Sequence, residues 1–303
     1  MKNKLTANIA LFMTALIWGL SFVAQRAGME YIGPFTFNMV RSILGGLSLI
    51  PVILFVKISA PDTRTERRKH FQHINLERAG IACGVALFAA MTIQQYCMKY
   101  VGAGKAGFIT ALYIIFVPIL AILLGEKLKK RVVVSVFLAL MGLYLLCFKP
   151  NSGFDIWDLF LLLSAFFYAI HIMLVNYYSR VVNPIKASCI QFFVVGILSA
   201  ILVTLFETPN FDAIMTCKIP LLYAGVITCG VAYTLQIYGQ KYTLPILASL
   251  IFSLESVFAV IGGSIILGEI MSLKEISGCI FMICGVILSN LHTKKEIKQI
   301  NQK

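Results

Sequence analysis

The chain has 303 residues, of which 59% are apolar and only 13% are charged, and its mean hydropathy is +0.87. Soluble domains are about 45–50% apolar and 25% charged, so this composition excludes an ordinary soluble fold and favours a membrane protein. The net charge of +13 does not indicate nucleic-acid binding, because Lys and Arg occupy short gaps between apolar runs and the two ends of the chain.

Ten apolar runs follow one another along the chain, close to the length of about 20 helical residues that crosses the hydrocarbon core. The first run follows Lys2 and Lys4, and we interpret it as a retained helix rather than a cleaved signal peptide. The sequence therefore predicts an all-α integral membrane protein with ten transmembrane helices. The predicted spans are 7–24, 36–56, 79–98, 106–124, 132–148, 159–178, 187–206, 219–238, 244–267 and 276–291.

The distribution of Lys and Arg predicts the orientation of these spans. The side of the membrane that holds the N-terminus carries 19 of these residues, and the other side carries six, with Arg41 inside a span. Basic loops are retained on the cytoplasmic side. We expect a multi-pass protein of the cytoplasmic (inner) membrane with both termini in the cytoplasm.

The two halves of the chain repeat each other at a nearly constant offset in residue number. Gly125-Glu126 recurs as Gly268-Glu269, at the ends of the fourth and ninth runs, and Gly142 recurs as Gly285, both at an offset of 143. Further pairs are Pro34 with Pro184 and Gly46 with Gly196, both at an offset of 150, and the similar segments 93–96 and 235–238. We predict a first repeat over 5–148, a second over 156–292 and a basic cytoplasmic tail over 293–303.

Each repeat holds five predicted helices, and five is an odd number. The second repeat must then enter the membrane from the opposite side, which makes the two repeats inverted. Inverted repeats are typical of secondary transporters, in which a site near the midplane opens alternately to each side. Gene duplication in a membrane scaffold that does not transport is the alternative.

Several short motifs recur along the chain in a definite order. They are Ile17-Trp18-Gly19, Pro34 to Arg41, Thr110 to Tyr113, Val117-Pro118, Ser253 to Ala259 and both Gly-Glu pairs. In this order and spacing they resemble the EamA-type ten-helix transporters of the drug/metabolite transporter (DMT) superfamily. In the ninth run Ser256 stands where that family often has proline, while Pro118 keeps a predicted kink in the fourth. The resemblance implies export or uptake of small metabolites, with amino acids prominent, and peripheral fifth and tenth helices.

Two charges lie well inside the predicted spans, Arg41 and Glu255. A charge at the bilayer centre costs at least about 2.5–3.5 kcal/mol, so such residues usually face the bundle interior and are functional. Glu255 lies at mid-depth and is predicted to bind a substrate ammonium group or to exchange a coupling proton; its alternative is a packing carboxylate. Arg41 is predicted to bind a substrate carboxylate, and its alternatives are an ion pair or snorkelling.

Polar residues at helical spacing predict which faces line a central cavity. They are Thr14, Trp18, Ser21 and Gln25 on the first helix, Gln94 and Gln95 on the third, Thr110 and Tyr113 on the fourth, Tyr168 and His171 on the sixth, and Tyr233, Gln236 and Gln240 on the eighth. We expect this cavity between the first, third, fourth, sixth, eighth and ninth helices, although polar groups in a bundle also serve as helix–helix contacts. His171 is a second candidate for proton coupling. The predicted substrate-binding residues, besides Arg41 and Glu255, are Trp18, Gln94, Tyr113, His171, Tyr233 and Gln236.

The sequence thus predicts a secondary transporter, most simply an exporter, of an amino acid, a related metabolite or a drug-like solute. We expect no enzymatic activity, metal or cofactor, and a monomer or homodimer in the lipid bilayer. The pattern at 102–107 fits G-x-G-x-x-G, but it joins two membrane helices instead of following a strand. The alternatives are a membrane-embedded enzyme that acts on lipid, which would need paired carboxylates or a metal cluster, and a channel.

Overall fold

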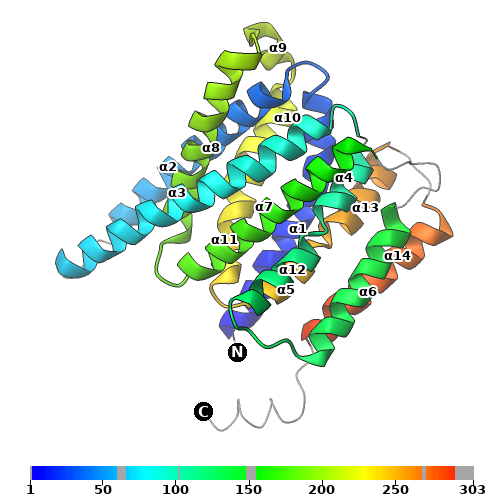
Figure 1. The fold of residues 1–303 in the computed structure, drawn as a ribbon. Coiled ribbons are helices and arrows are strands. Elements are labelled where there is room, and N and C mark those ends of the chain that lie inside the picture. Colours follow the sequence, from blue (N-terminus) through cyan, green and yellow to red (C-terminus); the bar gives the residue numbers. More distant parts are fainter. Residues whose placement is uncertain (1, 60–65, 102, 148–154, 268–270, 291–303) are drawn as a thin grey trace.

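The computed structural model describes residues 2–59, 66–101, 103–147, 155–267 and 271–290, and its secondary structure there is entirely helical. Figure 1 shows a bundle of long helices that run up and down between two ends. We call the end that holds Lys4 and Asn290 the base, and the end that holds Gly28 and Ile156 the top. The prediction of an all-α membrane fold is confirmed.

The first half of the chain contributes five membrane-length segments. The predicted fourth segment is divided into two helices, α4 and α5. The elements are α1 (Lys2–Gly28), α2 (Pro34–Ser59), α3 (Glu66–Cys97), α4 (Ala103–Thr110), α5 (Tyr113–Leu123) and α6 (Lys130–Cys147).

The second half repeats this plan with two divided segments. The predicted eighth segment contains a π-helix, η1, and the ninth is divided like the fourth. The elements are α7 (Ile156–Tyr178), α8 (Pro184–Phe206), α9 (Phe211–Thr216), α10 (Lys218–Leu222), η1 (Tyr223–Ala232), α11 (Tyr233–Gln240), α12 (Pro245–Phe252), α13 (Glu255–Leu267) and α14 (Leu273–Asn290).

Within the described residues, nine segments are long and apolar enough to cross a membrane. The predicted fifth span is the 18-residue helix α6, which is not among these nine, so the predicted count of ten is not matched in full. Large apolar side chains point outward, with Phe55 71% exposed and Ile265 78% exposed, whereas Gln95 and Gln236 are fully buried. Apolar side chains on the outside and polar side chains on the inside are the reverse of the arrangement in a soluble protein. This arrangement suits a lipid environment, which can solvate apolar groups and cannot satisfy the hydrogen bonds of polar ones.

The α2–α8 contact shows that the two halves are symmetric copies. A Cβ placed on Gly46 of α2 would lie 3.1 Å from the Phe193 ring of α8, and one on Gly196 of α8 would lie 2.9 Å from Ile43 of α2. The offset of 150 relates Gly46 to Gly196, and it also relates Ile43 to Phe193. The same close approach is therefore made twice, once from each half, as a two-fold relation requires.

The α6–α14 contact repeats this relation at the edge of the bundle, where Figure 1 shows the two helices side by side. A Cβ on Gly142 would lie 2.6 Å from the Gly278 carbonyl oxygen, and one on Gly285 would lie 2.8 Å from the Ser135 carbonyl oxygen. The offset of 143 converts both members of the first contact into those of the second. The peripheral position of these helices agrees with the prediction.

We expect Gly142→Ala to destabilise this helix pair, because a Cβ there must displace backbone rather than a flexible neighbour. Overpacking of this kind costs about 1–3 kcal/mol or more. The melting temperature of the purified protein in detergent should fall by several degrees. Gly107→Ala is the matched control, since its Cβ would meet only the Phe22 ring, 3.4 Å away, and an equal loss in both variants would contradict the prediction.

The π-helix marks the place where the second half has one residue more than the first. We call residues at equivalent positions of the two repeats mirror partners. Gly84 and Gly225 make such equivalent contacts at an offset of 141, whereas Gln94 and Gln236 are related by an offset of 142. The extra residue thus falls after Gly225, and a π-helix accommodates such an insertion without interrupting the helix. The side chains that face the two glycines are mirror partners as well, Val194 for Gly84 and Leu44 for Gly225.

Candidate functional site

A cavity lies in the top half of the bundle between both repeats. Its volume is about 40 Å³, enough for a few water molecules. The lining comes from seven of the membrane segments, including α2, which was not among the helices predicted to line it. The lining residues are Trp18, Ser21, Phe22, Gln25, Arg41, Met91, Gln94, Thr110, Tyr113, Tyr168, Thr228, Cys229, Tyr233 and Glu255.

Glu255 and Tyr113 occupy mirror positions on the two divided segments. Tyr113 is the first residue of α5, and Glu255, at an offset of 142, is the first residue of α13. The Tyr113 hydroxyl donates a 2.9 Å hydrogen bond to Glu255 Oε1, and both side chains are buried. Divided helices bring backbone ends and polar groups to mid-depth, which is where transporters of inverted-repeat architecture bind their substrates.

The breaks in the two segments do not depend on proline. The fourth segment breaks between Thr110 and Tyr113, ahead of the predicted kink at Pro118, and the ninth breaks between Phe252 and Glu255 with no proline nearby. At the second break the Ser253 hydroxyl donates to the Leu250 carbonyl oxygen at 2.8 Å. Such a bond competes with the helical backbone ladder, so Ser253 favours an interruption here.

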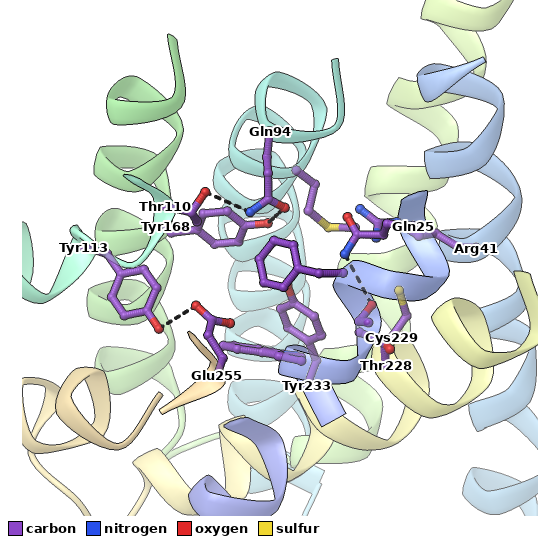
Figure 2. Close-up of a pocket in the computed structure, with 14 residues that line it drawn as sticks. Gln25, Arg41, Gln94, Thr110, Tyr113, Tyr168, Thr228, Cys229, Tyr233 and Glu255 are labelled. Atoms are coloured by element: carbon purple, nitrogen blue, oxygen red, sulfur yellow. Dashed lines mark hydrogen bonds between the residues drawn. The ribbon is translucent and has the colours of Figure 1, made fainter. Parts of the chain in front are cut away.

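A chain of hydrogen bonds links three helices on one wall of the cavity. The Tyr168 hydroxyl of α7 donates to Gln94 Oε1 of α3 at 3.1 Å, and Gln94 Nε2 donates to the Thr110 hydroxyl of α4 at 3.0 Å (Figure 2). Both polar ends of the Gln94 amide are thereby engaged, which removes the cost of burying it. In this structure these bonds hold the three helices of the wall together.

Arg41 is a buried cation without a carboxylate partner in the described part of the chain. It lies seven residues into α2, is 2% exposed, and its guanidinium carbon is 5.5 Å from the centre of the Phe37 ring. Its Nε has no hydrogen-bond acceptor among the described residues. Figure 2 shows Arg41 and Glu255 on opposite sides of the site, so the cavity offers one cationic and one acidic group that do not pair with each other.

Aromatic rings form the side of the cavity that faces the base. The Trp18 ring centre lies 4.8 Å from that of Tyr233 and 5.1 Å from that of Phe252, and Phe192 packs edge-on against Tyr233 at 5.1 Å. These rings come from α1, α11, α12 and α8, so their packing joins both halves. They separate the cavity from the base half of the bundle.

Six of the eight predicted site residues line this cavity together, and the other two do not. His171 and Gln236 lie on the base side of the aromatic rings, each in contacts of its own. His171 Nε2 is 3.2 Å from Gln191 Oε1, and Gln236 Nε2 donates to Gln240 Oε1 at 3.0 Å. The six that line the cavity are Trp18, Arg41, Gln94, Tyr113, Tyr233 and Glu255.

Four lining residues were not singled out by the sequence. Three of them are apolar or weakly polar and carry no signal that separates a cavity wall from a packing surface. The fourth, Thr228, lies in the π-helix, whose turn changes the face a residue occupies, so helical spacing could not have placed it. The four are Phe22, Met91, Thr228 and Cys229.

The donor set of the cavity does not resemble a metal or nucleotide site. Glu255 is the single carboxylate among the lining residues, and the described residues contain no group of three His, Cys, Asp or Glu that could hold a metal ion. Gly102 of the G-x-G-x-x-G pattern lies outside the described residues, and Ala103 already begins α4. The arrangement suits non-covalent binding of a small polar solute.

Comparison with known proteins gives a consistent result. A family model described as the EamA-like transporter family matches residues 5–148 and 155–291. An uncharacterized transporter of Archaeoglobus fulgidus is 32% identical over 290 residues, covering 95% of this chain and 87% of that protein. An uncharacterized transporter of Clostridium kluyveri is 24% identical over 303 residues, covering 95% and 94%.

Similarity extends to a plant protein and to a solved structure. A WAT1-related chloroplastic protein of Arabidopsis thaliana is 25% identical over 293 residues, covering 90% of this chain and 66% of that protein. A crystal structure that shares 18% sequence identity superposes with a TM-score of 0.72, covering 95% of this chain and 97% of the other. At that identity the superposition shows a shared fold.

Proposed function

Because this chain belongs to the EamA-like transporter family, we propose that it is a secondary transporter that exports a small carboxylate-bearing metabolite by alternating access. An amino acid or a related compound is the class that the cavity favours, ahead of a drug-like solute. Transport takes place across the cytoplasmic membrane, with the base of the bundle and both termini in the cytoplasm.

The observation that carries this proposal is Arg41, buried in the cavity with no acid partner in the described residues. A buried charge without a partner is costly, and a guanidinium binds a carboxylate through two parallel hydrogen bonds. Glu255 on the opposite side supplies a carboxyl group for the substrate's ammonium group or for an exchanged proton. A solute with separated charges, such as an amino acid, complements both groups.

A lipid-modifying enzyme and a scaffold fit these contacts less well. An enzyme of that kind needs paired carboxylates, a metal cluster or an activated nucleophile, and among the described residues that line the cavity Glu255 is the one acid. A scaffold has no need of an arginine and a glutamate inside the membrane that do not pair with each other, since each is costly to insert. A transporter would use both groups to bind its substrate.

The test is release of solute from liposomes that contain the purified protein. A mixture of radiolabelled protein amino acids is loaded inside, and we expect faster release than from liposomes without protein. Arg41→Gln should raise KM about tenfold to hundredfold, because hydrogen bonds to a charged group contribute roughly 1.5–3 kcal/mol.

Arg26→Gln is the matched control, since Arg26 is an exposed arginine at the end of α1 and lies outside the cavity. It should leave the release rate unchanged. Unlabelled amines that lack a carboxylate should compete poorly with the labelled amino acids. If the two arginine substitutions had equal effects, Arg41 would not be a substrate-binding residue.

A further inference from the structure

Two mirror interfaces in the bundle are joined by the same hydrogen bond. The Thr14 hydroxyl of α1 donates to the Ala232 carbonyl oxygen at 3.1 Å, and the Ser164 hydroxyl of α7 donates to the Ala90 carbonyl oxygen at 2.8 Å. The offset of 150 relates Thr14 to Ser164, and the offset of 142 relates Ala90 to Ala232. The contact of α1 with the end of η1 and the contact of α7 with α3 are thus two copies of one interface.

One helical turn further along, the two copies differ. In the α7–α3 copy Tyr168 donates to Gln94 at 3.1 Å, as Figure 2 shows. The same offsets of 150 and 142 make Trp18 and Gln236 the corresponding pair in the other copy. There Trp18 Nε1, a donor, and Gln236 Oε1, an acceptor, are both buried and without a partner among the described residues. The donor and the acceptor of the equivalent hydrogen bond are therefore present in this copy, but they do not bond to each other.

This difference follows the position of the cavity. The cavity lies in the top half, where Ser21, Arg41 and Gln94 line it. Their mirror partners in the base half are His171, Gln191 and Gln236, at offsets of 150, 150 and 142. These three line no part of that cavity, and His171 is held against Gln191 instead.

In a transporter with inverted repeats the two halves adopt different conformations. If each half takes the conformation of the other, a site that was open to one side of the membrane becomes open to the opposite side. Exchange here would break the Tyr168–Gln94 bond and make its mirror copy. Trp18 Nε1 and Gln236 Oε1 then gain a bond while Tyr168 and Gln94 lose theirs, so neither state leaves all four groups unsatisfied.

We propose that Trp18 Nε1 donates to Gln236 Oε1 when the Tyr168–Gln94 bond breaks, and that His171, Gln191 and Gln236 then line a second binding surface in the base half. This inference rests on the proposed transport function. The surface receives the same polar solute from the base, through neutral hydrogen-bonding groups, because Gln191 occupies the mirror position of Arg41. Trp18 and Gln236 act as positioning residues for the change of state.

Mirror substitutions provide the test, because each removes the donor of one bond and leaves an aromatic ring in place. Tyr168→Phe weakens the state with the top cavity, and Trp18→Phe weakens the opposite state. Two reporter cysteines, Gln25→Cys in the cavity and Val175→Cys at its mirror position, are placed in a background without native cysteines. Labelling by a charged maleimide is then measured in lipid nanodiscs, where both ends are accessible.

We expect opposite shifts. Tyr168→Phe should raise labelling at position 175 relative to position 25 by about two- to tenfold, and Trp18→Phe should lower this ratio by a similar factor, since a hydrogen bond contributes about 0.5–1.5 kcal/mol. Gln236→Leu removes the acceptor and should act like Trp18→Phe. Ser164→Ala is the matched control, because its bond is already present in both copies, and it should leave the ratio unchanged.

Shifts in the same direction for the two aromatic variants, or no shift in a folded protein, would overturn the proposal. Folding of each variant is checked by gel filtration and by its melting temperature. The labelling needs no substrate, so it reports on the two states even if the amino acid release assay fails. The two proposals can therefore fail separately.

Discussion

Glu255→Gln should remove most transport, at least about tenfold in initial rate, while the protein still inserts and folds. The substitution keeps the shape of the side chain and an oxygen that accepts the 2.9 Å hydrogen bond from Tyr113, so the junction of α5 and α13 is preserved. It removes the only carboxylate among the described residues that line the cavity. If that group binds a substrate ammonium group or exchanges a proton, no other lining residue can replace it.

The measurement is the initial rate of release of the radiolabelled amino acids at several pH values, together with the melting temperature in detergent. Tyr113→Phe is measured alongside, because it breaks the same hydrogen bond but keeps the carboxylate, so it separates loss of the bond from loss of the carboxylate. A structural carboxylate predicts the reverse: unchanged transport with an unchanged pH profile, and equal or higher stability in Glu255→Gln. That outcome would assign Glu255 to packing.

A reporter enzyme that is active only outside the cytoplasm should be inactive when fused after Lys303 and active when fused after Asn151. The base gathers basic residues from separate segments around one pocket, namely Lys4, Lys127, Lys129 and Arg131. At the top, Lys105 is paired with Asp158 at 2.7 Å. Since short basic loops are retained in the cytoplasm, this asymmetry predicts that the base faces the cytoplasm.

We expect reporter activity to be present in one fusion and absent in the other. The expression levels of the two fusions serve as the internal control. Activity after Lys303 with none after Asn151 would invert the orientation. It would then place the cavity of the top half on the cytoplasmic side. Equal activity of both fusions would contradict an odd number of spans between the first repeat and the C-terminus.

The sequence by itself determined the membrane class, the inverted repeat and the two buried charges. These features are local or periodic: long apolar runs need lipid, an odd number of spans inverts the second copy, and a charge inside such a run is costly wherever the helix packs. Arg41 and Glu255 were identified on that ground, and the structure places both in one cavity.

Only the tertiary structure decided which polar residues meet. Gln94 and Gln236 are mirror partners, and the sequence gives no reason to distinguish them. In the structure, however, Gln94 lines the cavity and Gln236 donates to Gln240. Helical spacing gives the face of a residue but not its neighbours on other helices, and the π-helix shifts even the face by one residue. The tertiary structure also shows that the two halves, although alike in sequence, make different contacts: Tyr168 donates to Gln94, whereas Trp18 and Gln236 at the equivalent positions do not bond to each other.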